Sequence, residues 1–508
     1  MKNLCQCKDG LLYNNFSIIF LQTFIAPNVQ IAENDFISGV TEGTIDEQLF
    51  IRETKDSEII NRYKLKGFDI SIEIGKENPV HIEGHVCVML TVFFNLTFEL
   101  SYRIIVPDDG ESFQFCRTSA PLDTDQMITL AALVQRVEHW ESDDRGIQTI
   151  SGSVESIKIT NLCLDAESTY RATSTDEVIT SFDEVQRRYA EYFYKMSDNQ
   201  FRLNEHHYVF LDIWESIDHK GALNGFPQMQ EEDIIEHIEM NHKSELIGLM
   251  SFYPEEWPYR MEGNYKDICG ENIAIDTDDL VLANENICVV FGTYGLRGDE
   301  APTDWKKHLM RRNHYHVSWP EYLVIIEILL SKKYMINYVL YKYINNSHLA
   351  VGGNIRTIIE QNAYLGIKLS NIILQLDSFR YLRYMSHKYM FQATNKRLRI
   401  DEDERHLNET IDHIDNSLNN ANNMIQLKEA YDSKYILLFI SFASLFGVLL
   451  AGDEVKVYSL LSESFGKSAA IFLIIITTLG IVIGIMHLAH ISIRMYRRQK
   501  RLKNDQNF

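Results

Sequence analysis

The stretch "FNLTFELSYRII", residues 94–105, alternates apolar and polar side chains. The apolar set consists of Phe94, Leu96, Phe98, Leu100, Tyr102 and Ile104. Successive side chains of a β-strand point to opposite faces, so this alternation predicts a strand that is buried on one face. "FDISIEI", residues 68–74, has the same pattern with Phe68, Ile70, Ile72 and Ile74. The two stretches together indicate a sheet with an apolar inner face.

Helical segments are interleaved with these strands. "DTDQMITLAALVQRVEHW", residues 123–140, opens with Asp123 or Thr124 as the N-cap, and "SFDEVQRRYAEYFYKM", residues 181–196, opens with Ser181. A short apolar strand is expected at residues 287–291, and a buried strand or short helix in the stretch at residues 11–29. We therefore predict an α+β domain over residues 1–320.

Composition excludes several classes of function. The formal net charge of −22 disfavours a nucleic-acid-binding surface, because polyanions repel one another. Seven scattered cysteines are typical of reduced intracellular thiols. The chain has no HExxH motif, no nucleophile elbow and no paired-cysteine zinc pattern, so we do not expect an enzyme.

Residues 321–434 are expected to form a helical stalk. Neither glycine nor proline occurs between Gly366 and Gly447, so the sequence does not force a helix to break there. A coiled-coil-like seam at spacings of three and four is formed by Ile400, Leu407, Ile411, Ile414, Leu418, Ala421 and Ile425, with Glu404 in one slot. The seam would pack either within one chain or in a bundle of identical stalks. Residues 322–344 predict a further helix beside the stalk, interrupted by Glu327, Lys332 and Lys333.

Two uncharged runs follow, at residues 435–452 and 469–493. At 1.5 Å per residue each would be about 27 Å or longer, enough to cross a hydrocarbon core of about 30 Å with its flanks. We therefore predict two transmembrane helices, an outer loop at 453–468 and a basic tail at 494–508. Because positive flanks stay in the cytoplasm, both termini would be cytoplasmic in a multi-pass membrane protein.

The first run carries the candidate pore residues. Ser441, Ser444, Val448 and Ala451 share one helix face, where small side chains would line a narrow path or simply pack. Asp453 and Glu454 would form acidic rings at its outer mouth in an oligomer.

The candidate ligand site has two pieces. A glycine-rich loop after the strand at 287–291 could present backbone N–H groups to phosphate, and a basic and aromatic segment follows it. The predicted residues are Gly292, Gly295, Arg297, Gly298, Arg311, Arg312, His314, Tyr315, His316 and Trp319. Ordinary turns and solvated basic helix faces use the same residues, so both interpretations stay open here.

This order of parts resembles the CorA family of divalent-cation channels, whose members have an α/β cytoplasmic domain, a long stalk helix, two membrane helices and a basic tail. The resemblance implies a homo-oligomer, a pentamer in the family, with the first membrane helix lining the pore. The family's Gly-Met-Asn signature is missing from "FGVLLAGDEV", residues 446–455. The chain is more similar to the divergent CorA-like effectors associated with type III CRISPR systems.

That second resemblance implies a prokaryotic inner-membrane effector in antiviral defence. It would sense a nucleotide second messenger, adenylated S-adenosylmethionine, and disrupt membrane integrity. The alternative is a transporter of divalent metal cations, for which Mg²⁺ would be the bound ion. Lipid bilayer, identical subunits and a small-molecule messenger would be the partners, and no direct nucleic acid binding is expected.

Overall fold

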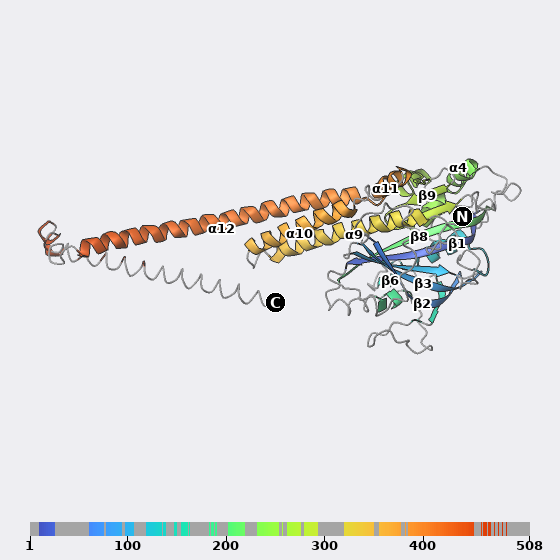
Figure 1. Ribbon diagram of the computed structural model, residues 1–508, viewed down its shortest axis with the longest axis horizontal. Coiled ribbons are helices and arrows are strands. Elements are labelled where there is room, and N and C mark those ends of the chain that lie inside the picture. The colour runs from blue at the N-terminus through green and yellow to red at the C-terminus, as the bar shows by residue number, and fades with distance from the viewer. Residues whose placement is uncertain are drawn as a thin grey trace, which may run out of the picture. The chain divides into compact units, whose positions relative to one another are not determined.

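Figure 1 shows the computed structural model, in which the described residues are drawn as ribbon and the others as a thin grey trace. The described residues are 10–25, 60–75, 78–93, 97–105, 118–134, 136–138, 147–149, 154–160, 162, 182, 184–186, 188–189, 202–218, 231–252, 257, 262–275, 279–292, 320–349, 355–376, 382, 385–451, 459, 461–464, 466–468, 472, 476, 480 and 484. The chain divides into two compact units, Met1–Leu340 with Ile367–Asn408, and Tyr341–Gly366 with Glu409–Phe508.

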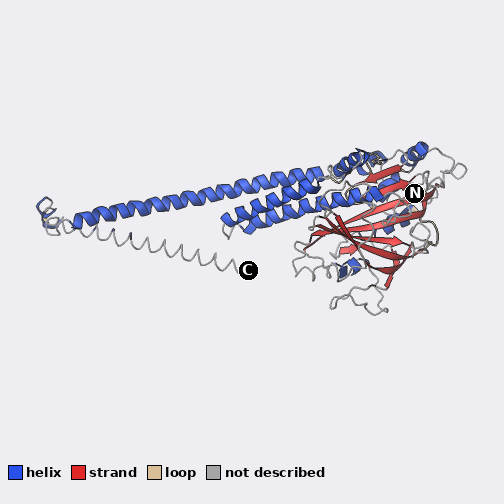
Figure 2. Ribbon diagram, viewed as in Figure 1, coloured by secondary structure: helices blue, strands red, loops and turns tan. Residues whose placement is uncertain are grey.

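The first unit is built on one eight-stranded mixed sheet, drawn in red in Figure 2. Its strand order is β7-β2-β3-β4-β1-β8-β10-β9. The strands are β1 (Leu11–Ile25), β2 (Ile60–Ile74), β3 (Val80–Phe93), β4 (Thr97–Ile105), β7 (Val154–Thr160), β8 (Arg202–Asp218), β9 (Asp279–Ala283) and β10 (Ile287–Gly292). Only the pairing of β10 with β8 is parallel among these pairs. A separate two-stranded sheet joins β5 (Arg136–Glu138) to β6 (Ile147–Thr149).

One face of the large sheet, called the first face below, is formed by the apolar side chains of the strands that alternate apolar and polar residues. Phe68, Ile70, Ile72 and Ile74 of β2 are all buried in one apolar core, as the alternation predicted. Phe98, Leu100, Tyr102 and Ile104 of β4 join the same core. The predicted strand at 94–105 is shorter than expected, because β3 ends at Phe93 and β4 begins at Thr97.

Helices cover this first face. They are α2 (Thr124–Ala131), α4 (Glu231–Asn241), α5 (Lys243–Ser251) and the short α6 (Tyr265–Ile268), with the 3₁₀ turns η1 (Ala132–Val134) and η5 (Glu262–Asn264). Asp123 caps α2 as predicted: its side chain accepts from the N–H of Gln126, and the Gln126 side chain accepts from the N–H of Asp123. α2 ends earlier than the sequence suggested, since η1 and β5 follow it.

A buried carboxylate ties three of these elements together. Glu245 of α5 accepts from the Leu11 N–H at 2.9 Å and from the Thr124 hydroxyl at 3.1 Å. Its other oxygen lies 3.1 Å from Nδ1 of His242. Since Glu245 is almost fully buried, these bonds replace the water that it loses on folding.

The second face of the sheet meets α9 (Pro320–Leu349). Leu280 and Leu282 of β9 belong to the first-face core, so Asp279 points to the opposite face. Asp279 accepts a 2.9 Å hydrogen bond from the Tyr322 hydroxyl near the start of α9. Residues 321–336 of α9 are buried all round the helix, which explains why this segment is apolar on nearly every side.

Three helices follow α9: α10 (Ile355–Leu376), α11 (Met385–Arg397) and α12 (Ile400–Ala451). The glycine- and proline-free stretch is therefore not one helix. α12 alone has 52 residues, and α11 ends directly before it. In the second unit, Tyr343 of α9 donates a 2.6 Å hydrogen bond to the carbonyl of Asn362 in α10, and the two helices form a hairpin there.

The prediction of two C-terminal transmembrane helices is wrong on this structure. Among the described residues, no helix combines the length and the apolar character that crossing a bilayer requires. The apolar run at 435–452 continues α12, whose described part is rich in charged residues up to Lys434. The run at 469–493 lies for the most part outside the described residues.

The predictions that depend on these spans are corrected with them. A membrane protein, an ion channel and a multi-pass inner-membrane location are not supported. The mixed sheet with helices is the part of the predicted fold class that the structure retains.

Candidate functional site

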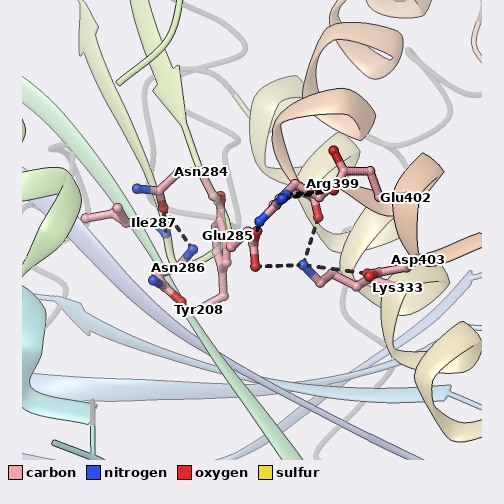
Figure 3. Close-up of polar contacts among 10 residues, drawn as sticks. Tyr208, Asn284, Glu285, Asn286, Ile287, Lys333, Arg399, Glu402 and Asp403 are labelled. Atoms are coloured by element: carbon pink, nitrogen blue, oxygen red, sulfur yellow. Dashed lines mark hydrogen bonds and ion pairs between the residues drawn. The ribbon is translucent and has the colours of Figure 1, made fainter. Parts of the chain in front are cut away.

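A polar cluster of the first unit lies where α12 begins. We call it the root cluster, and it comprises Glu285, Lys332, Lys333, the Leu398 carbonyl, Arg399, Glu402, Asp403 and Glu404. Figure 3 shows Glu285, Lys333, Arg399, Glu402 and Asp403 of this cluster. These residues come from the β9–β10 turn, from α9 and from the corner between α11 and α12.

A rigid turn presents Glu285. The Asn284 side-chain oxygen accepts from the N–H groups of Asn286 and Ile287 at 2.9 and 3.0 Å, which is an Asx turn. The Asn284 amide donates to the Met250 carbonyl, and Tyr208 donates to the Asn284 carbonyl at 3.1 Å. Because the sheet and α5 both hold this turn, Glu285 is fixed to the body of the domain.

The chain changes direction at Arg399, between α11 and α12. This residue has a φ of 57°, the left-handed conformation that a helix C-terminus often needs and that is uncommon outside glycine. Its carbonyl accepts from the Asp403 N–H at 3.0 Å and so opens α12. Asp401, Glu402 and Asp403 occupy the first turn, where their charges favour the positive end of the helix dipole.

Lys333 of α9 joins all of these elements. Its ammonium donates to the Leu398 carbonyl at 2.7 Å and to Glu285 at 3.4 Å, and lies 3.9 Å from Asp403. A cation at the last turn of α11 satisfies a carbonyl that has no partner within the helix. Burial raises the pKa of the Asp403 carboxyl, and the nearby Lys333 opposes this rise.

The neighbouring Lys332 makes a second buried link. Its ammonium lies 2.7 Å from Glu404, and the lysine side chain is only 4% exposed. By contrast, the pairs of Arg399 with Glu285 and Glu402 are well exposed. Solvent-exposed ion pairs contribute about 0–1 kcal/mol, so we assign the strength of the cluster to the two lysines.

A further contact holds α11. Arg397 lies directly over Gly270, whose φ is +82°, and a Cβ built at Gly270 would be 2.1 Å from the Arg397 Cζ atom. The adjacent Cys269 thiol is buried, and burial raises its pKa to about 12 although Arg397 lowers it. Glycine is needed here both for the backbone conformation and for the close approach.

The predicted ligand residues are not brought together by the described part of the chain. Gly292 is the last residue of β10 and pairs with Asp279. The other nine, Gly295, Arg297, Gly298, Arg311, Arg312, His314, Tyr315, His316 and Trp319, lie outside the described residues.

The predicted pore residues are likewise not brought together by the described part of the chain. Ser441 and Ser444 are exposed on α12. The side chains of Val448 and Ala451, and both Asp453 and Glu454, lie outside the described part of the chain. Among the described residues no group of three or more His, Cys, Asp or Glu side chains could hold a metal ion.

Three residues of the root cluster, Lys332, Lys333 and Glu404, stand out in the sequence, but their contacts do not. Lys332 and Lys333 were charges that interrupt an apolar helix, and Glu404 was a carboxylate in a slot of the α12 seam. The structure pairs Lys332 with Glu404. Opposite charges in two otherwise apolar faces were the signal that could have identified this contact.

Comparison of the chain with protein-family models, with curated proteins and with solved structures finds no match.

Proposed function

We propose that this chain is a non-enzymatic relay. In it, the α+β body binds a small nucleotide-like messenger and passes the resulting change to α12 through the root cluster. The single observation that carries the proposal is the placement of Lys333, which contacts the β9–β10 turn, the end of α11 and the start of α12 at once.

The physical argument rests on coupling. A ligand shifts a conformational equilibrium only by its difference in affinity for the two states. Lys333 and Lys332 are buried lysines, and their contacts with partly exposed carboxylates and with the Leu398 carbonyl give α12 a preferred attachment to the body. A small displacement of α9 or of the β9–β10 turn would therefore change the attachment of α12.

The chemical class of the messenger comes from the resemblance to CRISPR-associated effectors. Adenylated S-adenosylmethionine is the molecule to test first, and antiviral signalling is the process in which such a relay would act. The formal charge of −22 is consistent with a small-molecule partner in preference to nucleic acid.

A homo-oligomer is part of the proposal. Large apolar side chains are exposed along α12 at spacings of three, four and seven: Met424, Leu427, Tyr431 and Leu438. They lie on a different side of the helix from the seam that contains Leu407 and Leu418, both of which are buried. A second copy of α12 would cover such a stripe.

The test has two readouts on the full-length protein. Thermal denaturation with adenylated S-adenosylmethionine measures binding, because a ligand of the native state raises Tm. Amide hydrogen exchange at residues 401–407 measures whether ligand binding changes the first turns of α12. In the wild type, we expect the compound to raise Tm and to change the hydrogen-exchange rates at residues 401–407. In Lys333→Met, we expect the Tm increase to remain and these exchange rates to be the same with and without the compound.

Lys396→Met is the matched control, since Lys396 is an exposed lysine of α11. It should behave like the wild type in both readouts. If Tm does not rise at saturating compound, the chain does not bind this messenger. If the compound still changes the exchange rates at residues 401–407 in Lys333→Met, the root cluster is not the relay.

A further inference from the structure

The link between α11 and α12 is bent although its sequence favours a helix. From Met385 to Phe446 the chain contains neither glycine nor proline. α11 nevertheless ends at Arg397 and α12 begins at Ile400. Between them, Arg399 has a φ of 57°. A residue with a Cβ is more stable in the right-handed helical conformation, so the local chain favours one continuous helix at this position.

The bend depends on a contact from outside the two helices. In a continuous helix, the Leu398 carbonyl would accept from the N–H of Glu402, four residues later. It accepts instead from the Lys333 ammonium at 2.7 Å, and the Glu402 N–H bonds to the Arg399 carbonyl at 3.1 Å. Insertion of a side chain into the ladder of helical hydrogen bonds is a known cause of a kink. Lys333 therefore takes the place of the bond that would close the ladder across the corner.

A second contact also requires the bend. The side-chain amide of Asn395, near the end of α11, donates to the Asp401 carboxylate in the first turn of α12. The two residues are six positions apart, which on a continuous helix separates them by about 120° around the axis. A continuous helix would therefore lose this bond. Leu398 and Ile400 are also fully buried at the corner, so tertiary contacts favour the bent form while local helix preference favours the continuous one.

We propose that the corner between α11 and α12 is a two-state hinge, bent in the free protein and continuous when the messenger is bound. Messenger binding that moves α9 withdraws the Lys333 ammonium from the Leu398 carbonyl. The Glu402 N–H then bonds to this carbonyl, Arg399 becomes right-handed, and α11 and α12 form one helix. The inference rests on the proposed relay and deepens it, because it names the conformational change by which the body acts on α12.

The experiment measures a distance across the corner by double electron–electron resonance on the full-length protein. Spin labels are attached to keto amino acids incorporated at Tyr389 of α11 and Asn408 of α12, both exposed, so that the native cysteines stay unlabelled. An excess of unlabelled protein suppresses distances between copies. The two positions are 19 residues apart, so a continuous helix separates their Cα atoms by about 28 Å, and the bend shortens this distance.

We expect the shorter distance to predominate in the wild type without the compound. Adenylated S-adenosylmethionine should raise the ratio of the 28 Å form to the shorter form about tenfold or more. Lys333→Met should raise this ratio without the compound, because it frees the Leu398 carbonyl.

Two substitutions of Arg399 shift the balance in opposite directions. Valine is strongly disfavoured at positive φ and is tolerated in a right-handed helix, so Arg399→Val should raise the ratio about tenfold without the compound. Glycine adopts positive φ readily and weakens a helix interior, so Arg399→Gly should lower the ratio about tenfold in the presence of the compound. The matched controls are Arg405→Val and Arg405→Gly, at an exposed arginine inside α12, and neither should change the distances.

The outcomes separate the hinge from the relay and from the messenger. If the distances in both Arg399 variants and in Lys333→Met equal those of the wild type, the corner is rigid and the hinge is wrong, while a relay by another displacement still stands. If these variants shift the distances but the compound raises Tm without shifting them, messenger binding does not act through the hinge and the proposal is contradicted. If the compound does not raise Tm, the messenger assignment fails, and the variants alone decide whether the corner has two states.

Discussion

The ammonium of Lys333 lies 2.7 Å from the carbonyl oxygen of Leu398, so that a lysine of α9 caps the end of α11 at the point where α12 begins. The same ammonium contacts Glu285 on the β9–β10 turn. One side chain thus links the sheet to the longest helix of the described chain.

Replacing Lys333 with methionine tests the strength of this link. The substitution leaves the Leu398 carbonyl and the Asp403 carboxylate without their cation, so we expect the free energy of unfolding to fall by about 1–3 kcal/mol. Urea denaturation, followed by circular dichroism, measures it. Lys396→Met should change stability by no more than about 0.5 kcal/mol. Equal losses in the two variants would show that Lys333 has no special structural role.

Gly270 tests the contact with Arg397. With a φ of +82° and Arg397 directly above it, Gly270→Ala combines backbone strain with a steric clash. We expect a loss of about 1–3 kcal/mol in the free energy of unfolding. Gly263→Ala is the control, because nothing lies within 4 Å of a Cβ at that position. If Gly270→Ala is as stable as Gly263→Ala, α11 does not pack on this turn.

His387 predicts a pH dependence of stability. Burial lowers the pKa of this α11 imidazole from 6.5 to about 4. Because the folded protein resists protonation there, its contribution to stability is complete above pH 6.5 and falls as the pH drops toward about 4. Thermal denaturation between pH 7 and pH 4 should show a smaller decline in His387→Gln than in wild type.

The control for this titration is His413→Gln, since His413 is exposed on α12. Its pH profile should match that of the wild type. An unchanged profile in His387→Gln would assign the acid sensitivity to other groups.

Cys269 predicts slow thiol chemistry. Burial raises its pKa to about 12, so its thiolate fraction at pH 8 is lower than that of an ordinary cysteine by on the order of a thousandfold. Burial raises the pKa of Cys288 as well, with Asp212 adding to the rise. Iodoacetamide labelling followed by mass spectrometry should find both thiols unmodified in the native protein and modified in urea. Rapid labelling of native Cys269 would contradict its burial.

Local patterns predicted several elements correctly because they depend on short-range chemistry. The alternation at 68–74 places four apolar side chains of β2 in the core, and Asp123 followed by Gln126 starts α2. The short apolar run at 287–291 is β10. A strand period or a capping box involves residues within a few positions of one another, so the sequence displays it directly.

The same local reasoning placed a helix at residues 322–344, where α9 lies, but it did not locate the breaks between the helices that follow. Absence of glycine and proline permits a long helix but does not require one. The chain turns at Arg399, where Lys333 of α9 and Glu285 of the β9–β10 turn contact the corner from outside it. The apolar runs near the C-terminus met the length criterion for membrane spans, yet no helix of the described chain qualifies.

By itself, the sequence determined the apolar sheet face, the start of α2 and the presence of unusual charges at Lys332, Lys333 and Glu404. Only the tertiary structure decided that these charges meet at one point and that the face of β4 with Glu99, Ser101 and Arg103 is buried as well. The reason is that each contact joins elements distant in sequence, and its free energy depends on burial and on distances that the folded chain alone provides.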